Sequence, residues 1–477
     1  MEMESSSSKN GFRGIPRTVK EKVMGITKNV TKMGKDDPRK VMHCLKVGLA
    51  LTLNSMVYYY KPLYDSFGQS GIWAVLTVVV VFEFTVGATI SKSFNRGSAT
   101  LLAVCLGTGV VHMAELLSRE GQPFMLGVMV FIVAAVSTFT RFYPRIKRKY
   151  DYGVVIFLLT FSMIVVSGYR AEEIIEMAYQ RLSTVVIGGS ICIIISLVIC
   201  PVWAGEDLQN IVAANIDKIA NSLEGFGNAY FGYEECNDNG VVIDKGSSRK
   251  AGFDVNFCKS VLSSQASEES LATFAWWEMR HGGVFRSNHL LKHYLKVGGL
   301  VRQCACHIQT LSTYLTSHDR PQAGIEFGRT IKEPCTLMCI ESRKALKELS
   351  STIKSMTQPS PALQTHLQNT KAAMDDLQAA FQAASTVNAR TNLLQILTTL
   401  TVASILSDLT NCIHDLASSV QELSEKAHFK KQSLNRGTTA VNPVEEEEDG
   451  TVMVAVVIVG ASHQDSPEIE RLDVPKR

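Results

Sequence analysis

The chain has 477 residues, of which 46% are hydrophobic and 19% are charged. Apolar residues are concentrated between positions 41 and 204, and charged residues return at ordinary density from position 205 onward. This asymmetry excludes an ordinary soluble enzyme and an intrinsically disordered protein. A net charge of +3 is too small to indicate a nucleic-acid-binding protein.

Residues 1–40 form a polar, basic segment that contains ten Lys and Arg. The segment has no apolar stretch of the kind that a cleavable signal peptide needs. It either lies along the anionic inner leaflet of a membrane or acts only as a determinant of topology. Both interpretations put residues 1–40 in the cytosol.

Residues 41–204 contain six apolar runs separated by short polar links. A helix crosses a hydrocarbon core of about 30 Å when it has roughly 18 or more apolar residues. A buried helix in a large soluble core would explain one such run but not six in succession. The pattern therefore predicts six transmembrane helices, at residues 41–60, 71–86, 99–117, 123–140, 152–168 and 182–203.

The flanking charges predict the orientation of these helices. Seventeen Lys and Arg precede the first helix or lie in the second-to-third and fourth-to-fifth links, whereas four lie on the other side. Because positive charges stay on the cytosolic side, both termini and the long C-terminal half are expected in the cytosol. An even number of spans agrees with this arrangement.

Charged residues within or beside the predicted spans are candidates for a functional site. Lys46 and Glu83 lie inside the first two spans, where they either form a structural ion pair or line a permeation path. Arg170 and Arg181 flank the last outer link, where they either reach the lipid headgroups or attract anions to a pore. The cations outnumber the single acid and favour anions as the transported species; they are Lys46, Arg145, Lys149, Arg170 and Arg181.

A group of acidic residues lies on the expected outer face. Glu172 and Glu176 are four residues apart and share one helix face, and Asp65 lies in the first outer link. Carboxylates grouped in this way suit a hard, highly charged cation. A solvated acidic face has the same spacing, so both interpretations stay open.

Residues 205–430 show the apolar spacing of helices at 208–223, 288–315, 336–353, 361–384 and 389–427. Residues 431–477 contain an acidic run and are expected to be disordered. The predicted fold class is therefore an all-α membrane protein, with six transmembrane helices (41–204) followed by a cytosolic helical bundle (205–430).

Motifs of catalysis are missing from the sequence. It contains no GxxxxGK[ST] phosphate loop, no GxSxG elbow and no HExxH motif. Residues 304–307, which read Cys-Ala-Cys-His, lack the ligand spacing of a structural zinc site. We therefore expect that the chain is not an enzyme and has neither a cofactor nor a structural metal.

Four motifs stand in order around the predicted spans. They are GATISKSFNRG at 87–97, RFYPRIKRKYDYG at 141–153, the segment 168–181 followed by LSTVVIG, and CPVWAGEDL at 200–208. Together they resemble the plant aluminium-activated malate transporter family of anion channels, over residues 35–430. The resemblance implies a homodimer with a pore near the subunit interface, and cytosolic helices that support assembly and gating.

The resemblance also implies roles for residues of the anion path. In this family a lysine in the first span and a glutamate in the second influence transport, and Lys46 and Glu83 occupy those positions. Basic residues around the last two spans contribute to the path, and Arg170 and Arg181 match them. The basic link after the fourth span matches residues 145–149, which include the two candidate cations named above.

Members of this family that aluminium activates use acids on the outer face. Asp65, Glu172 and Glu176 are similar to these acids, and they are the candidate site for an activating trivalent cation. Aluminium activation is not shared by all members. The resemblance therefore indicates where an activator would bind and does not decide whether aluminium is the activator.

The family also carries a Trp-Glu-Pro motif in its cytosolic half. Trp277 and Glu278 match the first two positions, and Met279 replaces the proline. A proline would fix the local backbone, which a methionine does not. Trp277 and Glu278 are therefore candidates for a gating turn, with a turn packed beneath two tryptophans as the structural alternative.

The expected function is a passive anion channel that carries malate, and also chloride or nitrate, down the electrochemical gradient across a plant membrane. The alternatives are a proton-coupled carboxylate transporter, with Glu83 as the coupling acid, and a non-transporting membrane scaffold. The expected partners are malate and other small anions, membrane lipid and a second copy of the chain. The short N-terminal region favours the plasma membrane over the vacuolar membrane.

Overall fold

The structure is a computed structural model, and it describes residues 24–25, 28, 31–59, 71–117, 120–168, 174–231, 255–278, 288–316, 326–387 and 393–430. These residues are almost entirely α-helical, and the β-structure among them is one isolated bridge between Thr357 and Lys430. The prediction of an all-α chain is confirmed. Residues 431–477 lie outside the described residues, so their disorder stays a prediction.

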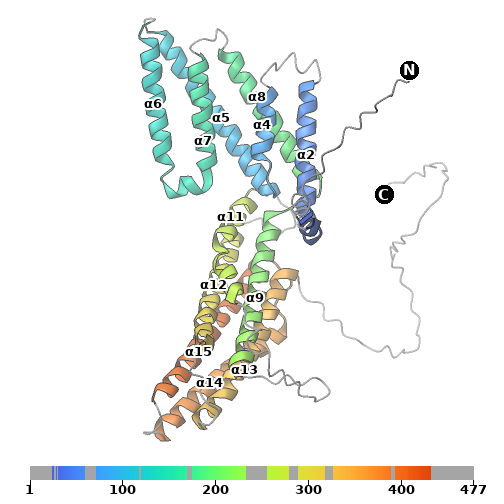
Figure 1. Cartoon of the computed structure of the whole chain (residues 1–477), viewed down its shortest axis with the longest axis vertical. Coiled ribbons are helices and arrows are strands. Elements are labelled where there is room, and N and C mark those ends of the chain that lie inside the picture. Colours follow the sequence, from blue (N-terminus) through green and yellow to red (C-terminus); the bar gives the residue numbers. More distant parts are fainter. Residues whose placement is uncertain are drawn as a thin grey trace, which may run out of the picture. The chain divides into compact units, whose positions relative to one another are not determined.

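The N-terminal part of the chain forms a bundle of apolar helices (Figure 1). Four of the helices contain segments long and apolar enough to cross a membrane, at residues 86–115, 122–140, 149–167 and 178–198. The helix α4 is apolar but has ten residues, and α2 carries three cations. The helices of this bundle are α2 (Pro38–Tyr59), α4 (Ile72–Val81), α5 (Val86–Glu115), α6 (Gln122–Thr140), α7 (Pro144–Gly168) and α8 (Ile174–Val198).

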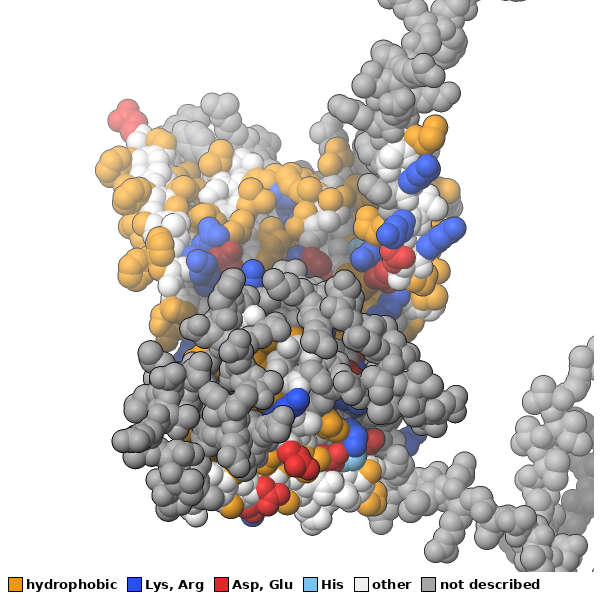
Figure 2. All heavy atoms as spheres, turned by 60° about the horizontal axis from the view of Figure 1, so that its bottom comes forward, with side chains coloured by type: hydrophobic (Ala, Val, Ile, Leu, Met, Phe, Trp, Pro, Cys, Tyr) orange, Lys and Arg blue, Asp and Glu red, His pale blue; other side chains and the backbone are white. Residues whose placement is uncertain are grey.

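The outer surface of this bundle is hydrophobic, as Figure 2 shows for the face in view. Large apolar side chains are exposed there, including Phe124 (78%), Phe131 (73%) and Val166 (69%). A soluble protein rarely exposes contiguous apolar patches of this extent, whereas a bilayer solvates them. The surface therefore agrees with helices that are surrounded by lipid.

The helix α5 is central to the bundle because it contacts α6, α7 and α8. A Cβ atom added at Gly107 would lie 2.9 Å from Cγ2 of Ile164 in α7. A Cβ atom at Gly188 of α8 would lie 2.8 Å from the carbonyl oxygen of Ala74 in α4. Small residues of this kind let membrane helices approach each other closely.

The structure differs from the predicted spans at the start of α5. The chain breaks at residues 82–85 between α4 and α5, and Thr85 caps α5 by accepting a hydrogen bond from the Ala88 N–H at 3.3 Å. Residues 87–97, predicted as a polar link, belong to α5. The physical reason is burial, because the polar residues of this stretch pack inside the bundle and do not need solvent; they include Thr89, Ser91, Asn95 and Arg96.

The C-terminal part forms a second helical bundle with one continuous hydrophobic core, and its centre includes the fully buried Phe226, Tyr294 and Leu346. All five helices predicted in residues 205–430 are present. The helices predicted at 336–353 and 361–384 are separate, because α13 ends at Ser355 and α14 begins at Pro361. The helices of this C-terminal bundle are α9 (Ala204–Phe231), α10 (Val255–Leu262), α11 (Gln265–Ala275), α12 (Asn288–Thr316), α13 (Glu326–Ser355), α14 (Pro361–Val387) and α15 (Leu393–Lys426).

Candidate functional site

Three cations are buried in the interior of the apolar bundle. Lys46 is 3% exposed, Arg96 is 4% exposed and Arg181 is 6% exposed. Among the described residues of α2 to α8, no acidic residue is buried to a similar degree. A buried charge inside a membrane bundle is expensive, so it usually faces a functional path or a specific partner.

Lys46 lies in α2 and donates a hydrogen bond from Nζ to the carbonyl oxygen of Cys200 at 2.7 Å. Cys200 follows the end of α8 and has a positive φ of 39°. The lysine therefore neutralises the carboxyl end of a membrane helix, where a cation interacts favourably with the helix dipole. The suggested ion pair between Lys46 and Glu83 is not formed, because Glu83 pairs with Lys92 of α5.

Arg181 lies in α8 between α4 and α7. Its guanidinium carbon lies 3.3 Å from the centre of the Trp73 ring, and Nη2 contacts the sulfur of Met163. Its Nε is buried and has no hydrogen-bond partner among the described residues. The alternative in which Arg181 reaches outward to lipid headgroups is wrong, because the side chain is enclosed.

Arg96 is a buried cation that the sequence analysis counted only as a charge of an inner link. Its Nη1 donates to the Tyr152 hydroxyl at 3.1 Å, and its Nε is buried without a partner in the described part of the chain. Arg96 and Arg181 are thus two buried arginines of the same bundle. Positions 89, 93, 96 and 100 are three or four residues apart and so share one helix face, and this spacing is the signal that would have found Arg96.

Other polar atoms of the same bundle also lack partners. The side-chain amide of Asn54 and the hydroxyls of Ser93 and Thr100 are buried without hydrogen bonds in the described part of the chain. Buried polar atoms normally find a partner, and water or a passing ligand supplies one where protein groups do not. The interior of the apolar bundle therefore contains several buried polar atoms without a protein partner in the described part of the chain, in addition to those of the two arginines.

The predicted outer site lies mostly beyond the described residues. Asp65, Arg170 and Glu172 are outside them. Glu176 lies in the first turn of α8, is exposed, and accepts a hydrogen bond from Gln180 at 3.2 Å. The described residues contain no group of three or more His, Cys, Asp and Glu positioned to hold a metal ion.

Arg145 and Lys149 lie at the beginning of α7, and both are exposed. They line a cavity formed with α5, α11 and α12, whereas Lys46 and Arg181 are not among its lining residues. Lys149 Nζ lies 5.8 Å from the centre of the Trp276 ring. The structure therefore separates these two predicted cations from the buried ones.

The predicted gating residues lie where the C-terminal bundle meets α5. Glu278 Oε1 accepts hydrogen bonds from the backbone N–H groups of Ala204 (2.6 Å) and Gly87 (3.1 Å), and Oε2 accepts one from Gly205 (3.0 Å). Burial raises the pKa of Glu278, and the three N–H donors oppose that rise. The Trp277 ring packs against Phe94 of α5 with ring centres 5.2 Å apart. Met279 lies outside the described residues.

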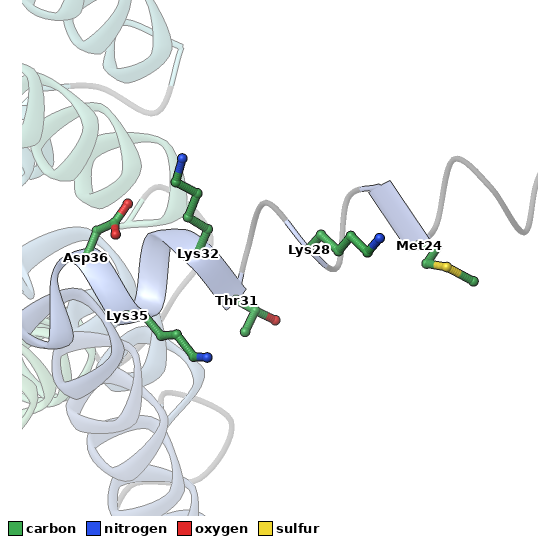
Figure 3. A pocket seen from close by; sticks show the side chains of 6 residues that line it. All are labelled: Met24, Lys28, Thr31, Lys32, Lys35 and Asp36. Atoms are coloured by element: carbon green, nitrogen blue, oxygen red, sulfur yellow. The ribbon is translucent and has the colours of Figure 1, made fainter.

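The basic N-terminal segment shows no comparable site. Lys28, Lys32 and Lys35 are exposed around a shallow hollow, and Figure 3 shows Lys32 and Lys35 leaving the helix in different directions. The other side chains that line the hollow come from the same segment, so no second element encloses it. We assign no function to this hollow.

The fold and the buried charges define an α-helical membrane protein with a cationic interior. The sequence profile of the family described as aluminium activated malate transporter matches residues 31–392. The chain belongs to this family.

Curated relatives agree with that assignment. The chain is 44% identical over 412 residues to aluminum-activated malate transporter 2 of Arabidopsis thaliana, which covers 86% of this chain and 80% of the relative. It is 44% identical over 437 residues to transporter 7 of the same plant, covering 86% and 84%. It is 42% identical over 413 residues to transporter 1 of Triticum aestivum, covering 85% and 86%. These relatives are named as transporters and not as enzymes.

Proposed function

We propose that the chain is a channel that carries malate, and also small inorganic anions such as chloride and nitrate, passively across a plant membrane. The names of the relatives support malate as a substrate. The observation that carries the proposal is the charge of the bundle interior, where the buried charged residues of the described helices are Lys46, Arg96 and Arg181. Pores that select anions use basic side chains in this way.

Each cation has a distinct role in the proposal. Arg96 and Arg181 attract the anion, because each keeps a buried Nε without a protein acceptor in the described part of the chain. Lys46 neutralises the end of α8 and keeps the local potential positive. Glu83 holds Lys92 through an ion pair, which leaves that acid without a free role in proton coupling. Arg170 lies outside the described residues, and its place on the anion path stays a prediction.

Arg145 and Lys149 were also predicted to lie on the anion path, and that part stays a prediction. Both line a cavity to which Lys46 and Arg181 do not contribute.

The proposal includes an arrangement in the membrane. Six helices cross the bilayer, with both termini and the C-terminal bundle in the cytosol, as the distribution of Lys and Arg favours. The working unit is a homodimer in the plasma membrane. The turn at Trp277 and Glu278 transmits movement of the C-terminal bundle to α5, because Glu278 bonds the N–H groups at the start of both α5 and α9.

The activator site is a separate part of the proposal. Asp65, Glu172 and Glu176 bind a trivalent cation on the outer face, and aluminium is the first ion to test. Glu176 is exposed at the start of α8, which agrees with a ligand reached from solution.

Two-electrode voltage clamp of oocytes loaded with malate tests the proposed function. Exchange of the external anions should shift the reversal potential with the malate and chloride gradients. A cation-dependent reversal potential, or malate uptake that requires a pH gradient, would instead identify a cation channel or the proton-coupled alternative. Absence of current with verified surface protein, with and without external aluminium, would contradict the channel.

A further inference from the structure

A cavity of about 1020 Å³ lies between the apolar bundle and the C-terminal bundle. Four helices contribute to its wall: α5 and α7 from the apolar bundle, and α11 and α12 from the C-terminal bundle. The cavity is separate from the buried cations at Lys46 and Arg181, which do not line it. Its volume falls at the upper end of the range of ligand-binding pockets.

Three cations line the cavity: Arg145 and Lys149 from α7, and Lys292 from α12. None of the three has an acidic partner among the described residues. The acid in the wall, Glu269, accepts a hydrogen bond from Gln265 at 3.0 Å. The lining therefore has three cations and one acid, so it keeps an excess of positive charge.

The rest of the wall is apolar and aromatic. Phe94 and Trp276 are 60% and 56% exposed, although both are large apolar side chains, and Leu291 and Leu295 continue the wall on α12. Lys149 lies over the Trp276 ring, so the charged and aromatic parts of the wall are in contact. The ligand should therefore be anionic at one end and apolar at the other.

The position of the cavity favours a lipid over a soluble anion. The apolar segment of α7 that is long enough to cross a membrane begins at Lys149, so Lys149 and Arg145 lie where lipid headgroups meet the hydrocarbon core. Tryptophan is enriched at this depth because its ring is apolar and its N–H is polar. Basic pockets between helices at this level bind multiply charged lipid headgroups.

We propose that this cavity binds an anionic phospholipid whose headgroup carries more than one phosphate. Arg145, Lys149 and Lys292 bind the phosphates, and Phe94 of α5 contacts the acyl chains. The site joins α7 to α12, so a bound lipid links the apolar bundle to the C-terminal bundle. The proposal requires helices in a bilayer and does not depend on anion transport.

The site is tested by titrating the purified full-length chain in detergent with water-soluble, short-chain lipids. Tryptophan fluorescence reports binding, because Trp276 lines the cavity. A dioctanoyl phosphatidylinositol bisphosphate should bind saturably. Dioctanoyl phosphatidylcholine, which has the same chains without net charge, should not compete. Inositol trisphosphate, which has the phosphates without chains, should bind about tenfold more weakly.

Variants assign the binding to this cavity. Each cation near a lipid surface raises the binding affinity about fivefold. The triple variant R145Q/K149Q/K292Q should therefore bind about 100-fold more weakly than the wild type. A matched triple variant, K147Q/K259Q/K332Q, removes three exposed lysines that do not line the cavity and should bind as the wild type does. Lys292→Gln alone changes one exposed residue outside the membrane helices and should lower the affinity about fivefold.

Several results would overturn the proposal. If the two triple variants bind the bisphosphate lipid with equal affinity, the cavity is not the binding site. Equal binding of inositol trisphosphate and the lipid would identify a soluble phosphate ligand instead of a lipid. Competition by phosphatidylcholine would show that the headgroup charge does not determine binding. The lack of a saturable signal with the bisphosphate lipid would show that the cavity does not bind it. Loss of transport alone would test the proposed function and leave these binding results unchanged.

Discussion

Glu278 accepts a hydrogen bond from the backbone N–H of Gly87 at 3.1 Å, although 191 positions separate the two residues. The same carboxylate accepts the N–H groups of Ala204 and Gly205. These are among the first N–H groups of α5 and α9, which have no partner within their own helices. One side chain therefore caps a membrane helix and a helix of the C-terminal bundle together.

Glu278→Ala should destabilise the chain by about 2 kcal/mol, because two helix N-termini lose their cap. Anion currents should also lose their normal voltage or ligand dependence, since α5 and α9 are no longer tied. Thermal unfolding of the purified chain and current–voltage curves measure the two effects. Glu206→Ala is the control. Glu206 is an exposed acid in the first turn of α9, so its substitution removes the same charge without removing the cap. Equal effects of the two variants would refute the capping role.

Gly87→Ala should disrupt the same junction by a steric route. A Cβ atom at Gly87 would lie 2.8 Å from the carbonyl carbon of Phe274 and would collide with the oxygen of that group. Because the obstacle is backbone, we expect a loss of about 1–3 kcal/mol. Gly97→Ala is the matched control in the same helix, since a Cβ there has open space and gains helix propensity. The order of the two melting temperatures checks the prediction, and a Gly87→Ala chain as stable as Gly97→Ala would contradict it.

Arg181→Glu should abolish anion current while surface expression is retained. The variant replaces a buried cation beside Trp73 with a charge that repels anions. Arg181→Gln separates loss of charge from charge reversal, and Arg96→Gln tests the second arginine of the same site. Lys332→Glu, an exposed change on α13, should leave the current intact. Voltage clamp with surface biotinylation provides the measurement, and normal current and selectivity in Arg181→Glu would exclude the arginine from the path.

The lowered pKa of Glu341 predicts that the stability of the C-terminal bundle depends on pH. Burial alone would raise the pKa of Glu341, but hydrogen bonds from Lys344, His366 and Asn369 outweigh it and lower the pKa to about 2. A carboxyl whose folded pKa lies below its ordinary value stabilises the fold above that ordinary value, which is about 4.5. That stabilisation is lost as the pH falls from about 4.5 through about 2.

The test of this dependence compares wild type with Glu341→Gln. The difference in melting temperature should be largest near neutral pH and should shrink as the pH approaches about 4 and below. Glu333→Gln, an exposed acid of the same helix, should show no such trend. A difference that grows on acidification would mean that the sign of the linkage is wrong.

The length of the apolar runs predicted helices of the apolar bundle, and apolar periodicity predicted five helices of the C-terminal bundle, because both are local properties. The short helices α10 and α11 were not predicted. The prediction failed at the start of α5, where Ser91, Asn95 and Arg96 read as a solvent-exposed link but are buried by neighbouring helices. Arg96 was missed as a site residue for the same reason. The partners of Glu278 could not be predicted from the sequence. They are backbone N–H groups, which every residue except proline has, and tertiary packing alone brings them to the carboxylate.

The reversal potential of the purified chain in a planar bilayer tests the central claim most directly. Potassium malate at two concentrations across the bilayer gives opposite equilibrium potentials for malate and for potassium. Our account predicts a reversal potential near the malate value, which moves towards zero when Arg96 and Arg181 are both replaced by glutamine. A reversal potential near the potassium value, or one that the arginine substitutions leave unchanged, would contradict an anion path built on these buried cations.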